Sequence, residues 1–182
     1  MGRLAARAGR VLPWWGVRWV ERRRARHRDL AGPIPSDALR ALAPFFPAET
    51  LAIARVSVVP RIPLSGLLRL VRRMGISAVD VDRILGITYL DTILVRHGAG
   101  VPIPLPTLFH ELVHVEQVRQ LGTRGFVERY VRGWLESGRS YAAIPLEEDA
   151  YALERRFRAA PEEPFDVATE VARRIGGSSS SK

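Results

Sequence analysis

The residues most able to do chemistry in this chain form one short HExxH motif, His110-Glu111-Leu112-Val113-His114. On an α-helix, positions four apart lie on one face, one turn above the other, so His110 and His114 can reach the same metal ion. Glu111 lies one step round the helix, beside that ion, where a general base for a water molecule is needed. The motif therefore predicts two imidazole ligands and one catalytic carboxylate.

The neighbouring residues predict the helix that this motif requires. Leu108 and Val115 belong to an apolar stripe with helical spacing. We expect Thr107 to be the N-cap and Gly122 to end the helix, which gives an element of roughly fifteen residues over 107–121. The alternative is that the two histidines are polar surface residues of an amphipathic helix. We favour the metal site because the motif stands on a capped helix between apolar residues.

Composition limits the class of protein. The chain has 182 residues, of which 47% are hydrophobic, so we expect one domain with its own core over residues 31–176. A basic, Trp-rich arm over 1–30 precedes it, and we expect residues 177–182 to be a disordered tail. There is no cysteine, so a zinc ion must be bound by histidine and carboxylate side chains.

Charge and hydropathy patterns bear on partners and location. The net charge is +9, but the arginines are spread through the chain and no aromatic-interleaved basic motif is present, so we expect no nucleic acid partner. No apolar run approaches the roughly twenty residues that cross a bilayer. There is also no clear signal peptide. We therefore predict a cytoplasmic protein. Residues 1–28 could still contact a membrane peripherally.

Residues 1–28 allow two interpretations. Trp14, Trp15 and Trp19 stand beside a run of arginines, a combination that suits contact with an anionic membrane surface. The alternative, which we favour at this point, is a helix whose tryptophans pack on the domain while its arginines are solvated.

Short strands are expected on the N-terminal side of the motif. Residues 87–89 and 92–95 read as two strands joined at Leu90 and Asp91, and residues 56–59 have the β-branched content of another strand. An open sheet edge beside a metal can bind an extended peptide by strand addition, although these strands could simply complete the core. Further helices are expected at 37–42, 49–54, 64–74, 77–85, 123–136, from Pro145 onward, and at 165–175.

A third metal ligand is expected in the helix that begins at Pro145. A catalytic zinc ion keeps three protein ligands and one open position. Glu147, Glu148 and Asp149 are candidates, but they point about 100° apart and cannot all face one ion. The ligand must lie near the apolar face of the helix, which leaves Glu147 and Asp149 as candidates. Glu147 is favoured because its side chain reaches further. The alternative is that these acids only interact with the helix dipole.

Three segments carry a resemblance to a known family. Residues 86–95, the stretch LFHELVHVEQ at 108–117 and the stretch EEDAY at 147–151 resemble minimal gluzincin-type zinc metallopeptidases. They are most similar to a small bacterial metallopeptidase-like domain of unknown function linked to contractile injection systems. The resemblance covers about residues 86–157 and implies Glu147 as the third ligand. Tyr151 stands where that family usually has an aspartate supporting the metal, so Asp149 or another nearby group would take that role.

The resemblance implies a zincin-like α+β fold with a small antiparallel sheet packed on several helices and the site between them. His110, His114 and Glu147 would hold Zn²⁺. A zinc-activated water would attack a carbonyl of a peptide or protein substrate, with Glu111 as general base.

A group that stabilises the oxyanion is also required. The candidates are Tyr141, Tyr151 and Arg139. The alternative function is a catalytically weak or inactive zincin scaffold that binds zinc and a protein partner. A further alternative is a basic membrane- or nucleic-acid-binding module in which the motif is incidental.

Overall fold

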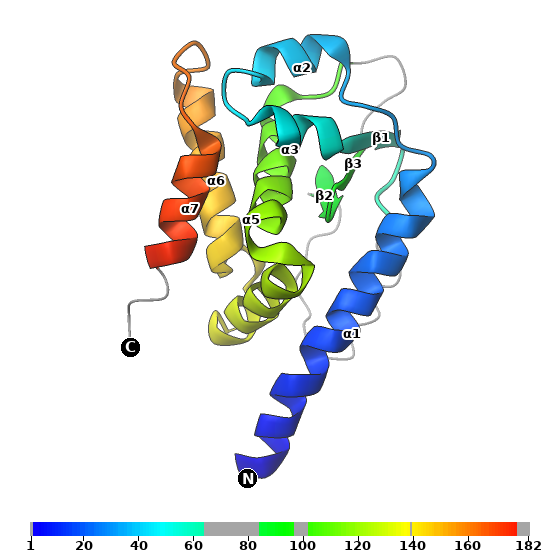
Figure 1. Ribbon diagram of the computed structural model, residues 1–182, viewed down its shortest axis with the longest axis vertical. Coiled ribbons are helices and arrows are strands. Elements are labelled where there is room, and N and C mark those ends of the chain that lie inside the picture. Colours follow the sequence, from blue (N-terminus) through cyan, green and yellow to red (C-terminus); the bar gives the residue numbers. More distant parts are fainter. Residues whose placement is uncertain (1, 64–83, 97–101, 139, 178–182) are drawn as a thin grey trace.

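The computed structural model describes residues 2–63, 84–96, 102–138 and 140–177, with residues 2–13 described by their backbone alone. Over these residues the protein is α+β, with six α-helices and a three-stranded sheet (Figure 1). Several sequence predictions lie outside the described residues. They are the helix at 64–74, most of the helix at 77–85, the candidate Arg139, and the tail beyond Gly177.

The HExxH motif lies on α5 (Leu105–Glu136), which runs through the centre of the molecule (Figure 1). Gly122 interrupts α5 with φ 68° and ψ 162°, in a region that glycine reaches without a side-chain clash. The predicted stop is therefore a bend between two helical segments. The predicted N-cap at Thr107 is wrong, because the helix begins at Leu105. Pro106 sits in the first turn, where its missing N–H would have no helical acceptor anyway.

The sheet has the strand order β1-β3-β2. β2 (Gly86–Tyr89) and β3 (Thr92–Arg96) form the expected antiparallel hairpin, whereas β1 (Arg55–Val59) pairs in parallel with β3. The prediction of an antiparallel sheet is therefore wrong in part, since the sheet is mixed. Residues 60–85 connect β1 to β2, and a connection of that length lets the chain enter the sheet in either direction, which local sequence patterns cannot reveal.

The other helices of the body surround α5. α6 runs alongside α5, α7 lies beside α6, and α2 and α3 lie near the first half of α5 (Figure 1). The expected starts of these helices agree with the structure to within two residues. Their bounds are Ser36–Leu42 for α2, Ala48–Ile53 for α3, Pro145–Ala159 for α6 and Val167–Gly177 for α7.

A cluster of phenylalanines joins α5 to α6. The Phe109 ring is fully buried and stacks on Phe157 of α6, with 4.5 Å between ring centroids. Phe45 packs edge-on against both rings, at 5.8 and 5.2 Å. Aromatic pairs of this kind add about 0.5–1.5 kcal/mol beyond the area that they bury. Because Phe109 directly precedes His110, the cluster sets where the motif lies relative to α6.

Residues 1–28 form one helix, α1 (Gly2–Arg28), except for Met1, which is outside the described residues. Its C-terminal half packs on the body, where Val20 is buried and the Trp19 ring meets Tyr89 edge-on at 5.7 Å. Trp14 and Trp15 instead remain 63% and 67% exposed. The packing interpretation therefore holds for Trp19 alone. Within the described residues, α1 and the other helices are all too short or too polar to cross a membrane.

Candidate metal centre

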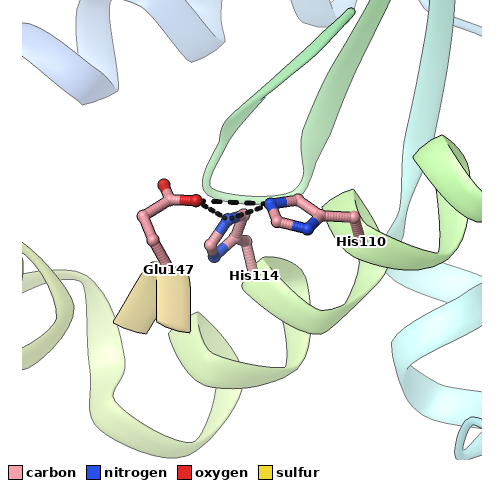
Figure 2. Close-up of side chains that lie close together, drawn as sticks. All are labelled: His110, His114 and Glu147. Atoms are coloured by element: carbon pink, nitrogen blue, oxygen red, sulfur yellow. Dashed lines mark hydrogen bonds and ion pairs between the residues drawn. The ribbon is translucent and has the colours of Figure 1, made fainter. Parts of the chain in front are cut away.

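Three side chains meet where α6 begins beside α5. His110 and His114 project from one face of α5, and Glu147 projects towards them from the first turn of α6 (Figure 2). The Nε2 atoms of the two histidines are 3.2 Å apart. Glu147 Oε2 lies 3.3 Å from His110 Nε2 and 3.4 Å from His114 Nε2. The structure thus brings together the two motif histidines and the glutamate expected as third ligand.

The size of this triangle matches a tetrahedral metal site. Three ligand atoms at about 2.0–2.1 Å from a tetrahedral zinc ion stand about 3.3–3.4 Å from one another. The three observed separations lie at or close to that range.

Hydrogen bonds at the far side of each imidazole determine its tautomer. His114 Nδ1 lies 2.8 Å from Gln117 Oε1, and the Gln117 amide group donates to the carbonyl of Leu146 at 3.0 Å. That second bond orients the amide, so its oxygen faces His114 and Nδ1 must carry the proton. His110 Nδ1 lies 3.1 Å from Glu154 Oε2, which can only accept when ionised. In both neutral rings the Nε2 lone pair therefore points into the triangle.

Three lone pairs facing one another require a positive charge between them. When no metal ion is bound, a proton on an imidazole supplies that charge. Burial disfavours the charged imidazole, but hydrogen bonds with Glu147 and Glu154 outweigh it and raise the pKa of His110 to about 10. Burial likewise opposes ionisation of Glu147, yet the two histidines hold its pKa well below the usual range. This donor set, two imidazoles and one carboxylate without any thiolate, fits zinc.

The second oxygen of Glu147 is also held. The Tyr130 hydroxyl, from the part of α5 beyond the bend, donates to Glu147 Oε1 at 2.6 Å. Glu147 itself is 1% exposed. Its carboxylate is therefore oriented at one oxygen by Tyr130 and leaves the other for the triangle, an arrangement that usually raises metal affinity.

Glu111 lies against the sheet. The Thr88 hydroxyl of β2 is 2.6 Å from Glu111 Oε2 and 3.2 Å from the Glu111 backbone oxygen. Gly86, also on β2, approaches so closely that a Cβ there would stand 2.5 Å from Glu111 Oε1. Burial raises the pKa of Glu111, although the nearby His110 and His114 oppose the rise. A raised pKa makes this carboxylate a stronger proton acceptor than a solvated glutamate.

The remaining candidates occupy different places. Asp149 is turned towards α7, where its Oδ1 pairs with Arg174 at 3.1 Å, so it is not part of the triangle. The Tyr151 ring lies against the His110 ring, with 4.5 Å between centroids. Tyr141 is in the short 3-10 helix before α6. Desolvation, together with the nearby Tyr130 and Glu147, raises its pKa well above the usual value.

Sequence reasoning missed three residues of this centre. Gln117 entered only as the last residue of the stretch at 108–117 that carries the resemblance, and Tyr130 only within the helix expected at 123–136. Glu154 was not noticed, although it follows Glu147 by seven residues, which is two helical turns and the same face. Its carboxylate lies against His110 Nδ1, whereas the resemblance had suggested Asp149 or another nearby group for support of the site.

Comparison with known proteins places this chain in no family. No family model, no curated protein and no solved structure matches it.

Proposed function

We propose that this protein is a zinc-dependent metallopeptidase with a gluzincin-like site. The observation that carries the proposal is the triangle of His110 Nε2, His114 Nε2 and Glu147 Oε2. The buried carboxylate of Glu111, the residue after His110, is held against the sheet by Thr88. A zinc ion held there would lower the pKa of water and polarise a peptide carbonyl.

The protein side chains divide the remaining work. His110, His114 and Glu147 would hold the ion. Gln117 and Glu154 keep the Nδ1 protons away from the triangle, so both imidazoles present lone pairs to it.

Glu111 moves the proton. It accepts a proton from the attacking water and then gives it to the leaving amine of the peptide. The Thr88 hydrogen bond holds Oε2 in place while burial keeps the carboxyl group basic. Tyr141 and Tyr151, on either side of the Glu147 segment, are the candidates for stabilising the oxyanion.

The substrate is a peptide or protein segment in extended form. β2 has β3 as its one strand partner among the described residues, so its other edge is open there to a further strand. Because β2 also carries Thr88 and Gly86, a peptide added to this edge would lie next to Glu111.

Burial favours a second candidate function, a zinc-binding scaffold that does not cleave its partner. His110, Glu111 and His114 are only 5–7% exposed, which leaves little room for a substrate carbonyl. In that case the ion would stabilise the junction of α5 and α6, and Glu111 would have no chemical role.

Zinc content and turnover decide between these functions. We expect close to one zinc ion per chain by elemental analysis, and its loss in His114→Ala. Digestion of a peptide library should be abolished in Glu111→Gln, which keeps the ligands and therefore the zinc. Zinc without turnover in the wild-type protein would select the scaffold, and undiminished zinc in His114→Ala would remove both functions.

A further inference from the structure

Helix α1 carries nearly all of the net charge of this protein. Residues 1–28 contain nine arginines and one acidic residue, Glu21, for a net charge of +8 out of +9 for the whole chain. Arginines are spread through the sequence, as expected, but the acidic residues that balance them elsewhere are missing here. The basic character therefore belongs to one element.

One face of α1 is held by the body of the protein. Arg24 makes two hydrogen bonds to the Asp91 carboxylate, at 2.7 and 2.8 Å, and Arg28 lies 2.8 Å from the same carboxylate. Trp19 packs on Tyr89 next to them. These contacts tie α1 to the turn between β2 and β3 and account for two of its arginines.

The opposite side of α1 is exposed, and we call it the outward face. It consists of Trp14, Trp15, Arg18, Arg22 and Arg26, all exposed. Positions 15, 18, 22 and 26 recur at helical spacing and form one stripe. The Arg18 guanidinium lies 5.7 Å from the centroid of the Trp14 ring, and none of the three arginines pairs with an acidic residue that the structure describes.

We infer that the outward face of α1 binds the surface of an anionic lipid bilayer, independently of the proposed enzymatic function. Indole rings have an apolar body and a polar N–H and accumulate at the boundary between headgroups and acyl chains. Arginines beside them reach anionic headgroups with a planar donor group. The N-terminal end of α1 extends beyond the other helices and strands that the structure describes (Figure 1).

The two exposed tryptophans favour a bilayer over nucleic acid. Binding to nucleic acid through phosphates depends on charge and weakens steeply with salt. The two adjacent indoles, which are 63% and 67% exposed, add an apolar contribution to the binding free energy that salt does not screen. A bilayer uses both parts of the outward face, whereas a phosphate backbone uses the arginines alone.

Vesicle flotation of the full chain tests this inference. The protein should float with vesicles of phosphatidylcholine and phosphatidylglycerol, and its tryptophan emission should shift to shorter wavelength. Binding to phosphatidylcholine alone should be at least about tenfold weaker. The double variants Trp14→Ala/Trp15→Ala and Arg18→Glu/Arg22→Glu should each lower partitioning to the anionic vesicles by about tenfold or more.

A matched control separates the outward face from total charge. Arg40→Glu/Arg155→Glu makes the same charge change at exposed positions of α2 and α6 and should lower partitioning by less than about twofold. Circular dichroism melting checks that all variants are folded. No flotation of the wild-type protein would overturn the inference, as would an equal loss in the control. Tighter binding to duplex DNA, undiminished in Trp14→Ala/Trp15→Ala, would also overturn it in favour of a nucleic acid surface.

Discussion

Two regions of this molecule hold charged side chains in contrasting surroundings, the junction of α5 with α6 and the outward face of α1. At the junction His110, His114, Glu147 and Glu154 are buried, and each has a defined partner. On the outward face the arginines are exposed and have no acidic partner among the described residues.

The difference shows how burial assigns a role to charge. A buried charge without a partner costs several kcal/mol, so the fold must supply neighbours, and their geometry then defines what can bind. An exposed charge is solvated at little cost and remains available to a surface outside the molecule. Changes at the junction should therefore have large, position-specific effects, whereas single changes on α1 should have small ones that add.

The largest expected effect separates neighbouring acids of α6. Glu147→Ala should lower zinc affinity by about three orders of magnitude, because it removes one of the three proposed ligands. Glu148→Ala, one residue along and exposed, should leave the affinity nearly unchanged. Competitive zinc titration measures both. Retained affinity in Glu147→Ala together with loss in Asp149→Ala would move the third ligand to Asp149.

A smaller effect on zinc affinity is expected from Glu154, which orients the proposed ligand His110. Glu154→Ala should weaken zinc binding by about 10–100-fold, since His110 loses the acceptor that orients its ring. Glu154→Gln keeps an oxygen at that position and should recover part of the affinity. The same titration applies, with Arg158→Ala as the control that removes only the outer partner of Glu154. Equal affinities in all three variants would mean that Glu154 does not position His110.

The contact between β2 and Glu111 allows the proposed role of Glu111 to be tested while the three proposed metal ligands are unchanged. Gly86→Ala places a methyl group against the Glu111 carboxylate and should cost about 1–3 kcal/mol of stability. It should also lower the rate of peptide hydrolysis while the zinc content stays the same. Gly32→Ala, where a Cβ meets nothing within 4 Å, is the matched control. Full activity in Gly86→Ala would show that Glu111 need not stay where β2 holds it.

A pH-dependent change in stability is expected in the metal-free protein. The pKa of His110 is raised to about 10 from 6.5, so its contribution to stability is complete below about pH 6.5 and is lost as the pH rises towards 10. One such group changes stability by up to about 1.4 kcal/mol per pH unit, or roughly 2–5 °C in Tm. Thermal melting with a chelator should show this decline between pH 7 and 10, and His110→Ala or added zinc should flatten it. An identical slope in His110→Ala would assign the titration to another group.

The local sequence was sufficient for the parts of the site that depend on a single helix. The four-residue spacing of His110 and His114 places both on one face of any α-helix, whatever surrounds it. The start of α6 at Pro145 and the hairpin of β2 and β3 also follow from neighbouring residues, because proline and short β-branched runs act locally. The choice of Glu147 over Glu148 came from helical geometry in the same way.

Only the tertiary structure decided which residues complete the site and how the sheet is built. Tyr130 reaches Glu147 because α5 bends at Gly122, and Glu154 reaches His110 because α6 lies along α5. The parallel pairing of β1 with β3 depends on where a long connection returns the chain. These relations join residues far apart in sequence. Their partners are selected by packing and by the cost of leaving buried polar groups unpaired. The seven-residue spacing places Glu154 on the same face as Glu147, but it does not show that His110 lies opposite.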